Sequence, residues 1–384
     1  LLSKNRLLLG YTIKRISTTA NMQKPTRHGI IFVIILICIA LGIRLYASSP
    51  GIVESLYTSG IYPYISSFLR ILFGWLPFSA GDILYGLLFL FALWKSAQRL
   101  KRLRKEKLSG FRPKIAWLNI FIFFLLLYIV FNLLWGLNYN RKGIHFQLNF
   151  EREKYSEAEL VQINHLLLEK VNGCKAALIH RNIPYPSTKD LFIKTNHAFA
   201  AAAKKYPFLR YSHPSIKPSF FNFIGNYFGF SGYYNPFTGE AQVNTDIPPF
   251  LQPAVNCHEI SHQLGYAKEN EANFAGYIVA TASGDSLFMY SAYFDLFLYA
   301  NRNLYRTDSV AANNFFLLLH PGVKEDIATL KAYYKKYENP AEPVFRWVYG
   351  KYLEANDQPL GMVTYSEVVA DVIAWYKKYG KIGG

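Results

Sequence analysis

The stretch NCHEISHQLGYAKENEANFAGYIV, residues 256–279, contains two histidines four positions apart, with a glutamate directly after the first. On a helix, positions i and i+4 project from the same face, so the imidazoles of His258 and His262 can bind one ion. Glu259 then lies beside the ion, where its carboxylate can take a proton from metal-bound water. The stretch therefore predicts a Zn²⁺ site.

A third protein ligand has to come from further along the chain, because catalytic zinc usually takes three protein ligands and a water. Pro253 and Gly265 predict where the first helix begins and where the chain turns sharply after it. A second helical pattern then starts with two acidic residues, Glu269 and Glu271. These lie roughly 200° apart around a helix axis, so only one of them can face the ion.

An HExxH motif followed by a helix with the pattern Glu-x-x-Ala-Asn resembles the gluzincin group of metallopeptidases. The resemblance implies an α+β zincin-like fold in which His258, His262 and Glu269 bind Zn²⁺ and Glu259 is the general base. It also implies that Asn273, four residues after Glu269, supports a ligating histidine.

The sequence departs from the common gluzincin pattern in the length of the connection. Only seven positions separate His262 from Glu269, where most gluzincins have a longer excursion. The string HExxHxxG is also similar to the metzincin motif, but the position of the third metzincin histidine is taken by Lys268. Glu271 therefore stays the alternative third ligand.

Two further parts of a zincin site have only candidates in this sequence. Residues 239–246 alternate in polarity within the aromatic, glycine-rich stretch 219–246, which is typical of strands and turns. We interpret 239–246 either as the edge strand that pairs with an extended peptide or as a plain core hairpin. Zincins often use a Tyr, His or Arg from the C-terminal part to stabilise the oxyanion, and Tyr299, Arg302 and Tyr365 are available.

The cysteines and the other histidines show no ligand spacing. The three cysteines, Cys38, Cys174 and Cys257, form no CxxC pair, so neither a disulfide framework nor a thiolate zinc cluster is predicted. Cys257 is expected to be a small buried side chain. The histidines expected to be ordinary surface or core residues include His145, His197, His213 and His320.

The first third of the chain contains three apolar segments, near residues 29–47, 76–94 and 115–137. The third is 23 residues long without a charge, which is enough to cross a bilayer with some tilt. Between the first two, residues 62–78 are amphipathic, so we expect them to lie along the membrane interface or to re-enter it. The lipid bilayer is therefore an expected partner.

The positive charge of the chain is concentrated around these segments. Residues 1–114 contain 17 Lys and Arg but three acidic residues, a net +14 of the total +17. Basic loops are typical of the cytoplasmic side, so residues 1–28 and 95–114 predict a cytoplasmic N-terminus. Three crossings of a bacterial inner membrane then leave residues 138–384 in the periplasm. A nucleic-acid site is not expected, because the charge does not lie on a folded domain.

Residues 138–384 read as one domain outside the membrane. Ser156 and Glu159 form a capping box at the start of a helical pattern, and strands before helices favour an α+β fold. The HExxH motif follows the last apolar segment by about 120 residues, so we expect it to lie outside the bilayer. At the other end of the chain, Met22 is the expected natural start, with residues 1–21 as translated upstream sequence.

The complete layout, three apolar segments and then the HExxH domain, resembles an uncharacterised membrane-protein family of Bacteroidetes, a domain of unknown function with a gluzincin-like motif. We therefore expect a membrane-anchored zinc metalloendopeptidase that hydrolyses a peptide or protein substrate on the outer face of the inner membrane. The alternative is a non-catalytic zinc-binding sensor or scaffold that uses the zincin fold as a receptor. A transporter is less favoured, because Arg44 and Arg70 are almost the only charges in these segments.

Overall fold

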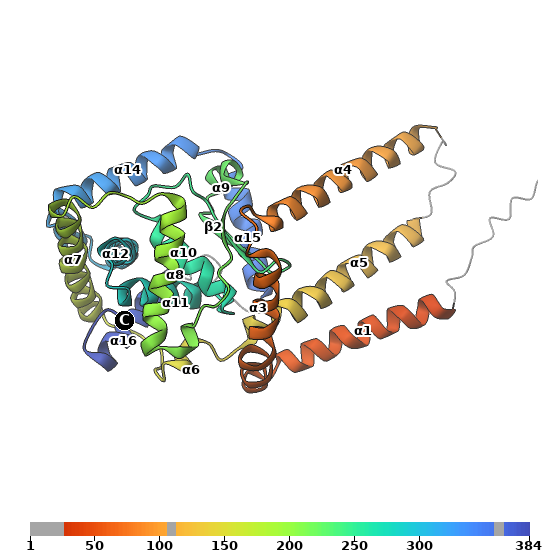
Figure 1. Ribbon diagram of the computed structural model, residues 1–384, viewed down its shortest axis with the longest axis horizontal. Helices are drawn as coiled ribbons and strands as arrows, with labels where there is room; N and C mark the ends of the chain where they lie inside the picture. The colour runs from red at the N-terminus through yellow and green to blue at the C-terminus, as the bar shows by residue number, and fades with distance from the viewer. Residues whose placement is uncertain (1–26, 106–112, 357–364) are drawn as a thin grey trace, which may run out of the picture.

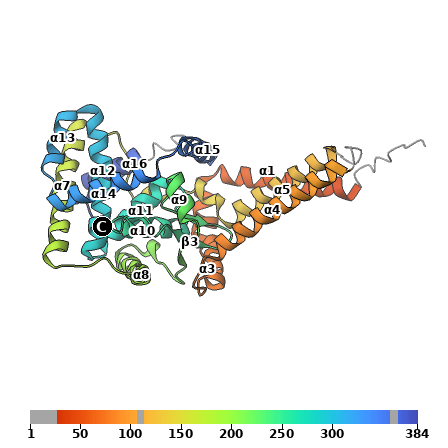
Figure 2. The same ribbon diagram turned by 90° about the horizontal axis from the view of Figure 1, so that it is seen from above.

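The computed structural model describes residues 27–105, 113–356 and 365–384. Three long helices extend side by side from one end of a mostly helical body that contains one small sheet (Figures 1 and 2). The expectations for Met22 and for most of the basic segment 1–28 lie outside the described residues.

The three extended helices are the predicted apolar segments. Each is long and apolar enough to cross a membrane, and most of its side chains are not buried by the rest of the protein. They are α1 (Arg27–Ala47), α4 (Ala80–Lys105) and α5 (Pro113–Leu134). The second begins four residues later than the segment 76–94 suggested, because Ser79 caps it by accepting a hydrogen bond from the amide of Asp82.

The chain between α1 and α4 folds back toward the body. It forms α2 (Pro50–Ile52), the π-helix η1 (Val53–Ile61) and α3 (Tyr62–Phe73). The amphipathic segment expected at 62–78 is helical through α3, which exposes Phe68, Ile71 and Leu72 and buries Tyr62 and Arg70. The buried face of α3 therefore belongs to the protein core, and its exposed face is apolar.

The sheet has three short strands in the order β1-β3-β2. These are β1 (Ile216–Pro218), β2 (Gly232–Asn235) and β3 (Glu240–Val243), with β1 parallel and β2 antiparallel to β3. Of the two interpretations of 239–246, the edge strand is wrong, because β3 is paired on both sides and β2 lies at the edge instead. The core hairpin is confirmed, because β2 and β3 pair antiparallel and β3 lies in the middle of the sheet. A helix, α9 (Asn222–Phe228), replaces part of the expected strands and ends at Gly229, whose φ is +77°.

Helices make up the rest of the body. At its centre lie α10 (Gln252–Gln263), α11 (Glu269–Ala282) and α12 (Ser286–Thr307). Around them are α7 (Glu157–His180), α8 (Thr188–Lys205), α13 (Ser309–Leu317), α14 (Pro321–Tyr337), α15 (Glu342–Ala355) and α16 (Tyr365–Tyr379). The short connections include η2 (Gly136–Asn140), α6 (Ile144–Gln147) and η3 (Pro207–Leu209). The capping box of Ser156 and Glu159 is confirmed at the start of α7, and Cys257 is fully buried as expected.

The apolar helices and the body share a core at their junction. Its buried members come from α1, η1, α3, α5, the residues just after α5 and the turn after α10, and include Tyr57, Tyr62, Trp135, Tyr139 and Ala267. Side chains from before and after residue 138 therefore pack in the same cluster.

Polar contacts also join α4 to the sheet. Glu240 of β3 accepts hydrogen bonds from the backbone amides of Ala80 and Gly81, at 3.0 and 2.6 Å, in the first turn of α4. Carboxylates are stabilising at this end of a helix, because it presents unpaired amides and the positive end of the helix dipole. A strand of the body thus caps one of the apolar helices.

Candidate metal centre

The two helices of the HExxH stretch, α10 and α11, are joined by a tight turn. Pro253 lies at the start of α10, and Gly265 follows its end with φ of +88°. A Cβ atom on Gly265 would lie 2.9 Å from Cε1 of Tyr62, so the turn needs glycine for both conformation and space. This turn returns the chain so that the first residue of α11, Glu269, faces the last turns of α10.

Three side chains converge where the helices face each other. Nε2 of His258 and Nε2 of His262 are 3.0 Å apart, and the carboxylate oxygens of Glu269 lie 3.3 and 3.7 Å from them. All three ligand atoms lie within 4.8 Å of one another, and in the described part of the chain this is the one such group found. Their side chains are mostly buried, with 17%, 7% and 17% exposed.

The surroundings fix the orientation of His262. Its Nδ1 lies 2.7 Å from the carbonyl oxygen of Tyr266, so Nδ1–H donates there and the lone pair of Nε2 faces the other ligands. Two imidazole nitrogens and one carboxylate make the donor set typical of a catalytic zinc ion. The residues therefore fit Zn²⁺.

A family of proteins of unknown function, DUF3810, matches residues 57–373. The chain belongs to the DUF3810 family. This confirms the expected kinship with a family of unknown function, and the matched region includes α3, α4, α5, the sheet and all three converging side chains. No curated protein and no solved structure matches the chain.

The convergence of these side chains in the DUF3810 chain shifts the pKa of all three groups. Burial lowers the pKa of His258, but the hydrogen bond to Glu269 and the nearby carboxylate charges outweigh it and raise the pKa to about 9. Burial and the charge of His258 lower the pKa of His262 to about 4. Burial raises the pKa of Glu269, but hydrogen bonding and the histidine charges bring it down to about 2. The Glu269 carboxylate therefore favours the charged form of His258, and the charge of His258 disfavours that of His262.

Glu259 lies next to these ligands at the edge of the sheet. Its residue is 4% exposed, and its Oε2 has no hydrogen-bond partner among the described residues. Burial raises the pKa of Glu259 to about 8. A Cβ atom on Gly232, the first residue of β2, would lie 2.5 Å from Oε1 of Glu259. The carboxylate therefore fits beside β2 because residue 232 is a glycine.

Glu271 and Asn273 occupy different places on α11. The Glu271 carboxylate packs against Gly143, away from the converging ligands, and burial raises its pKa. Asn273 interacts with His258 and contributes to the raised pKa of that histidine. The structure thus brings Glu269 and Asn273 to the histidines and leaves Glu271 outside the ligand group.

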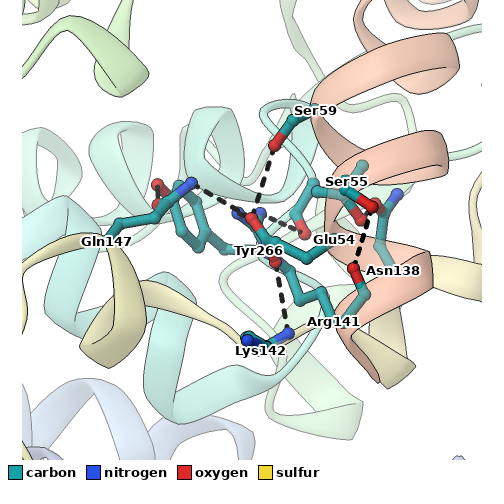
Figure 3. Close-up of polar contacts among 11 residues, drawn as sticks. Glu54, Ser55, Ser59, Asn138, Arg141, Lys142, Gln147 and Tyr266 are labelled. Carbon is teal, nitrogen blue, oxygen red and sulfur yellow. Dashed lines mark hydrogen bonds and ion pairs between the residues drawn. The ribbon is translucent and has the colours of Figure 1, made fainter. Parts of the chain in front are cut away.

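A buried ion pair supports the turn between α10 and α11 from the junction (Figure 3). Arg141 donates to both carboxylate oxygens of Glu54 in η1, at 3.0 and 3.1 Å, and to the carbonyl oxygen of Gly265 at 3.1 Å. Its guanidinium lies over the ring of Tyr266, 4.6 Å from the centroid. Because Tyr266 also accepts the hydrogen bond from His262, the ion pair helps to orient a ligand.

Tyr349 is a site residue that the sequence did not reveal. Its hydroxyl donates a 2.8 Å hydrogen bond to Oε1 of Glu269, and three residues later Tyr352 contacts the hydroxyl of Tyr139 at 3.3 Å. Both tyrosines belong to α15, which therefore lies over the ligands. The residue is 80 positions from Glu269 and carries no motif, so only the tertiary fold could identify it.

Among the described residues, none of those expected to stabilise the oxyanion joins the group of three ligands. Tyr299 interacts with Asp295, a carboxyl near His258 whose pKa is raised by burial to about 6. The side chain of Tyr365 lies outside the described residues. Among the remaining histidines, His145 is paired with Asp371 at 2.6 Å.

Proposed function

We propose that this DUF3810 protein is a membrane-anchored, zinc-dependent metallopeptidase of the gluzincin type, with its catalytic domain on the outer face of a bacterial inner membrane. The observation that carries the proposal is the convergence of His258, His262 and Glu269 beside a buried Glu259. Many zinc sites consist of metal ligands with no acid or base beside them, but a purely structural site has no use for the carboxylate of Glu259.

In this mechanism His258, His262 and Glu269 would hold the ion, which when bound would supply Lewis acidity and lower the pKa of a water. Glu259 would take a proton from the attacking water and return it to the leaving amine. Its raised pKa suits both steps, because a base with a pKa near neutrality can also act as an acid. Tyr349 orients Glu269, and Gly232 gives Glu259 its position.

Support for a zincin-like arrangement comes from the sheet. Of the two outer strands, β2 is the one whose first residue, Gly232, touches Glu259. An extended peptide that pairs with the open edge of β2 would pass beside the base. The edge strand missing from residues 239–246 is therefore supplied by residues 232–235.

Support for the topology comes from the placement of charge along α4. This helix begins at the body, and its basic residues, among them Lys95, Arg99 and Lys101, lie in the half that extends away from it (Figure 1). Basic residues favour the cytoplasmic side. We therefore place the body on the opposite, periplasmic side.

Full-length protein in lipid nanodiscs tests the proposal with two measurements, zinc content and hydrolysis of a fluorogenic peptide library. We expect about one zinc per chain. Glu259→Gln should keep this zinc and lose activity by about 10²- to 10⁴-fold, the usual contribution of a general base. Glu325→Gln, an exposed carboxylate on α14, is the matched control and should change neither.

The two measurements separate the alternatives. Zinc bound by wild-type protein without hydrolysis of any library member would favour the non-catalytic sensor or scaffold. Wild-type protein that binds no zinc after metal reconstitution would contradict both functions. Hydrolysis that persists in Glu259→Gln would contradict the mechanism.

A further inference from the structure

Helix α10, which carries the two converging histidines, ends beside the ends of the apolar helices that adjoin the body. Trp135 is the first residue after α5, and its Nε1 donates a 3.1 Å hydrogen bond to the carbonyl oxygen of His262. The ring centroids of these two residues are 6.1 Å apart. From α3, the Tyr62 hydroxyl and Ser66 Oγ donate to the next carbonyl, that of Gln263, at 2.8 and 2.9 Å. A ligand 127 positions from Trp135 in sequence is therefore adjacent to it in space.

The edge strand β2 contacts the same ends of the apolar helices. The Tyr233 hydroxyl is hydrogen-bonded to Asp82 in the first turn of α4, and the Tyr234 ring lies 5.3 Å from the ring of Trp135. Neighbouring residues of a strand point to opposite faces, so β2 contacts α4 with one side chain and the end of α5 with the next. A peptide bound along β2 would therefore run close to the ends of two apolar helices.

Two helices at this end of the body, α9 and α15, expose large apolar side chains. On α15, Val344, Trp347 and Val348 are 62%, 64% and 51% exposed, and on α9, Phe223 and Ile224 are 70% and 43% exposed. Both helices lie at the end of the body from which α1, α4 and α5 extend (Figures 1 and 2). Because these exposed apolar side chains lie at the end of the body from which the apolar helices extend, we expect a bilayer that holds those helices to meet them as well.

We infer that the substrate is a membrane-anchored polypeptide and that the bond cleaved lies just outside the bilayer. The inference rests on the proposed function and adds the substrate class to it. Because an extended chain advances about 3.3 Å per residue, a bond cleaved beside the ends of the apolar helices lies only a short chain length from the substrate's own membrane span. The reaction is hydrolysis, in which the water oxygen bonds to the carbonyl carbon, the C–N bond breaks and the amine takes the proton.

This location is more specific than the one expected from the sequence interval. The motif follows the last apolar segment by about 120 residues, which predicted a site outside the bilayer. The fold returns α10 to Trp135, so the site lies outside the apolar helices but directly against their ends.

Photo-crosslinking in liposomes tests the inference without depending on catalysis. The Glu259→Gln protein is reconstituted with a single-span peptide whose outer segment carries benzoylphenylalanine at about 3, 8, 15 or 25 residues from its span. We expect the two nearest positions to crosslink to the peptides containing β2 and α10 at least about fivefold more than the farthest. Equal yields at all positions, the highest yield from a far position or from within the span, or no crosslink would overturn the inference.

A cleavage comparison with wild-type protein uses the same outer segment with and without its membrane span. The anchored form should be cleaved at least about tenfold faster, because anchoring raises its effective concentration at the site. Equal rates would overturn the inference and leave the peptidase function intact. Position-dependent crosslinking without cleavage of either form would contradict the peptidase function, and with it the cleaved bond, while supporting the part of the inference that places a membrane-proximal segment of the partner at the site.

Discussion

Nε2 of His258 lies 3.3 Å from Oε2 of Glu269, the first residue of the following helix. The turn at Gly265 makes this contact possible across a connection of seven positions. Glu271, two residues after Glu269 and therefore roughly 200° further round the helix, faces Gly143 instead. The choice between the two carboxylates is thus decided by the side of α11 from which each one projects.

The ligand choice is tested by two matched substitutions. Glu269→Gln should weaken zinc binding by about 100-fold or more, since even groups that only orient a ligand contribute about 10- to 100-fold. Glu271→Gln should retain zinc affinity. Isothermal titration with zinc on metal-stripped protein measures both, and a larger loss in Glu271→Gln would reverse the assignment.

The position of the general base is tested at Gly232. Gly232→Ala places a Cβ atom 2.5 Å from Oε1 of Glu259, so the carboxylate has to move. We expect hydrolysis to fall by about 100-fold, the usual result of displacing a catalytic group by about 1 Å, with zinc content unchanged. Gly173→Ala is the control, because its Cβ meets no atom within 4 Å. Full activity in Gly232→Ala would mean that Glu259 is not the base.

The ion pair between η1 and the turn is tested by breaking it. The Arg141 and Glu54 side chains are only 2% and 7% exposed, and removing one partner leaves the other charge buried. Arg141→Met should therefore lower the free energy of unfolding by about 3–5 kcal/mol. Lys351→Ala, which breaks an exposed pair with Glu354, should change it by less than about 1 kcal/mol. Chemical denaturation in micelles measures both, and equal small effects would show that the pair is not structural.

The capping box of α7 predicts a pH-dependent contribution to stability. Hydrogen bonds from the Ser156 backbone and from Lys377 lower the pKa of Glu159 from 4.5 to about 2. A lowered carboxyl pKa stabilises the fold above the unfolded value, and this contribution is lost as the pH falls from about 4.5 to about 2. Glu159→Gln should therefore melt below wild type at pH 6, and the two should converge near pH 2. Glu157→Gln, on the same turn, is the control; a gap that persists at pH 2 would contradict the prediction.

Local patterns predicted the parts of the site that lie close together in sequence. The HExxH spacing, the turn at Gly265 and the opposite directions of Glu269 and Glu271 all follow from helix geometry and glycine conformation. The capping box and the apolar helices follow from equally local rules. No long-range information was needed for any of them.

The errors arose where distant segments decide the structure. Polarity alternation in β3 shows that it is a strand but not how many neighbours it has, and the parallel partner β1 comes from an earlier segment. Tyr349 reaches Glu269 only because α15 packs over α11. Trp135 contacts His262 because the fold returns to the apolar helices, and sequence distance gives no sign of that return.

The cap that Glu240 places on α4 also sets an order of events during synthesis. The amide of Gly81 and its acceptor are 159 positions apart. At about 5–20 residues per second, the ribosome makes the acceptor roughly 8–30 s after the amide. The first turn of α4 must wait that long for its partner, so this apolar helix is synthesised early but gains its cap only after more than half of the chain has been made.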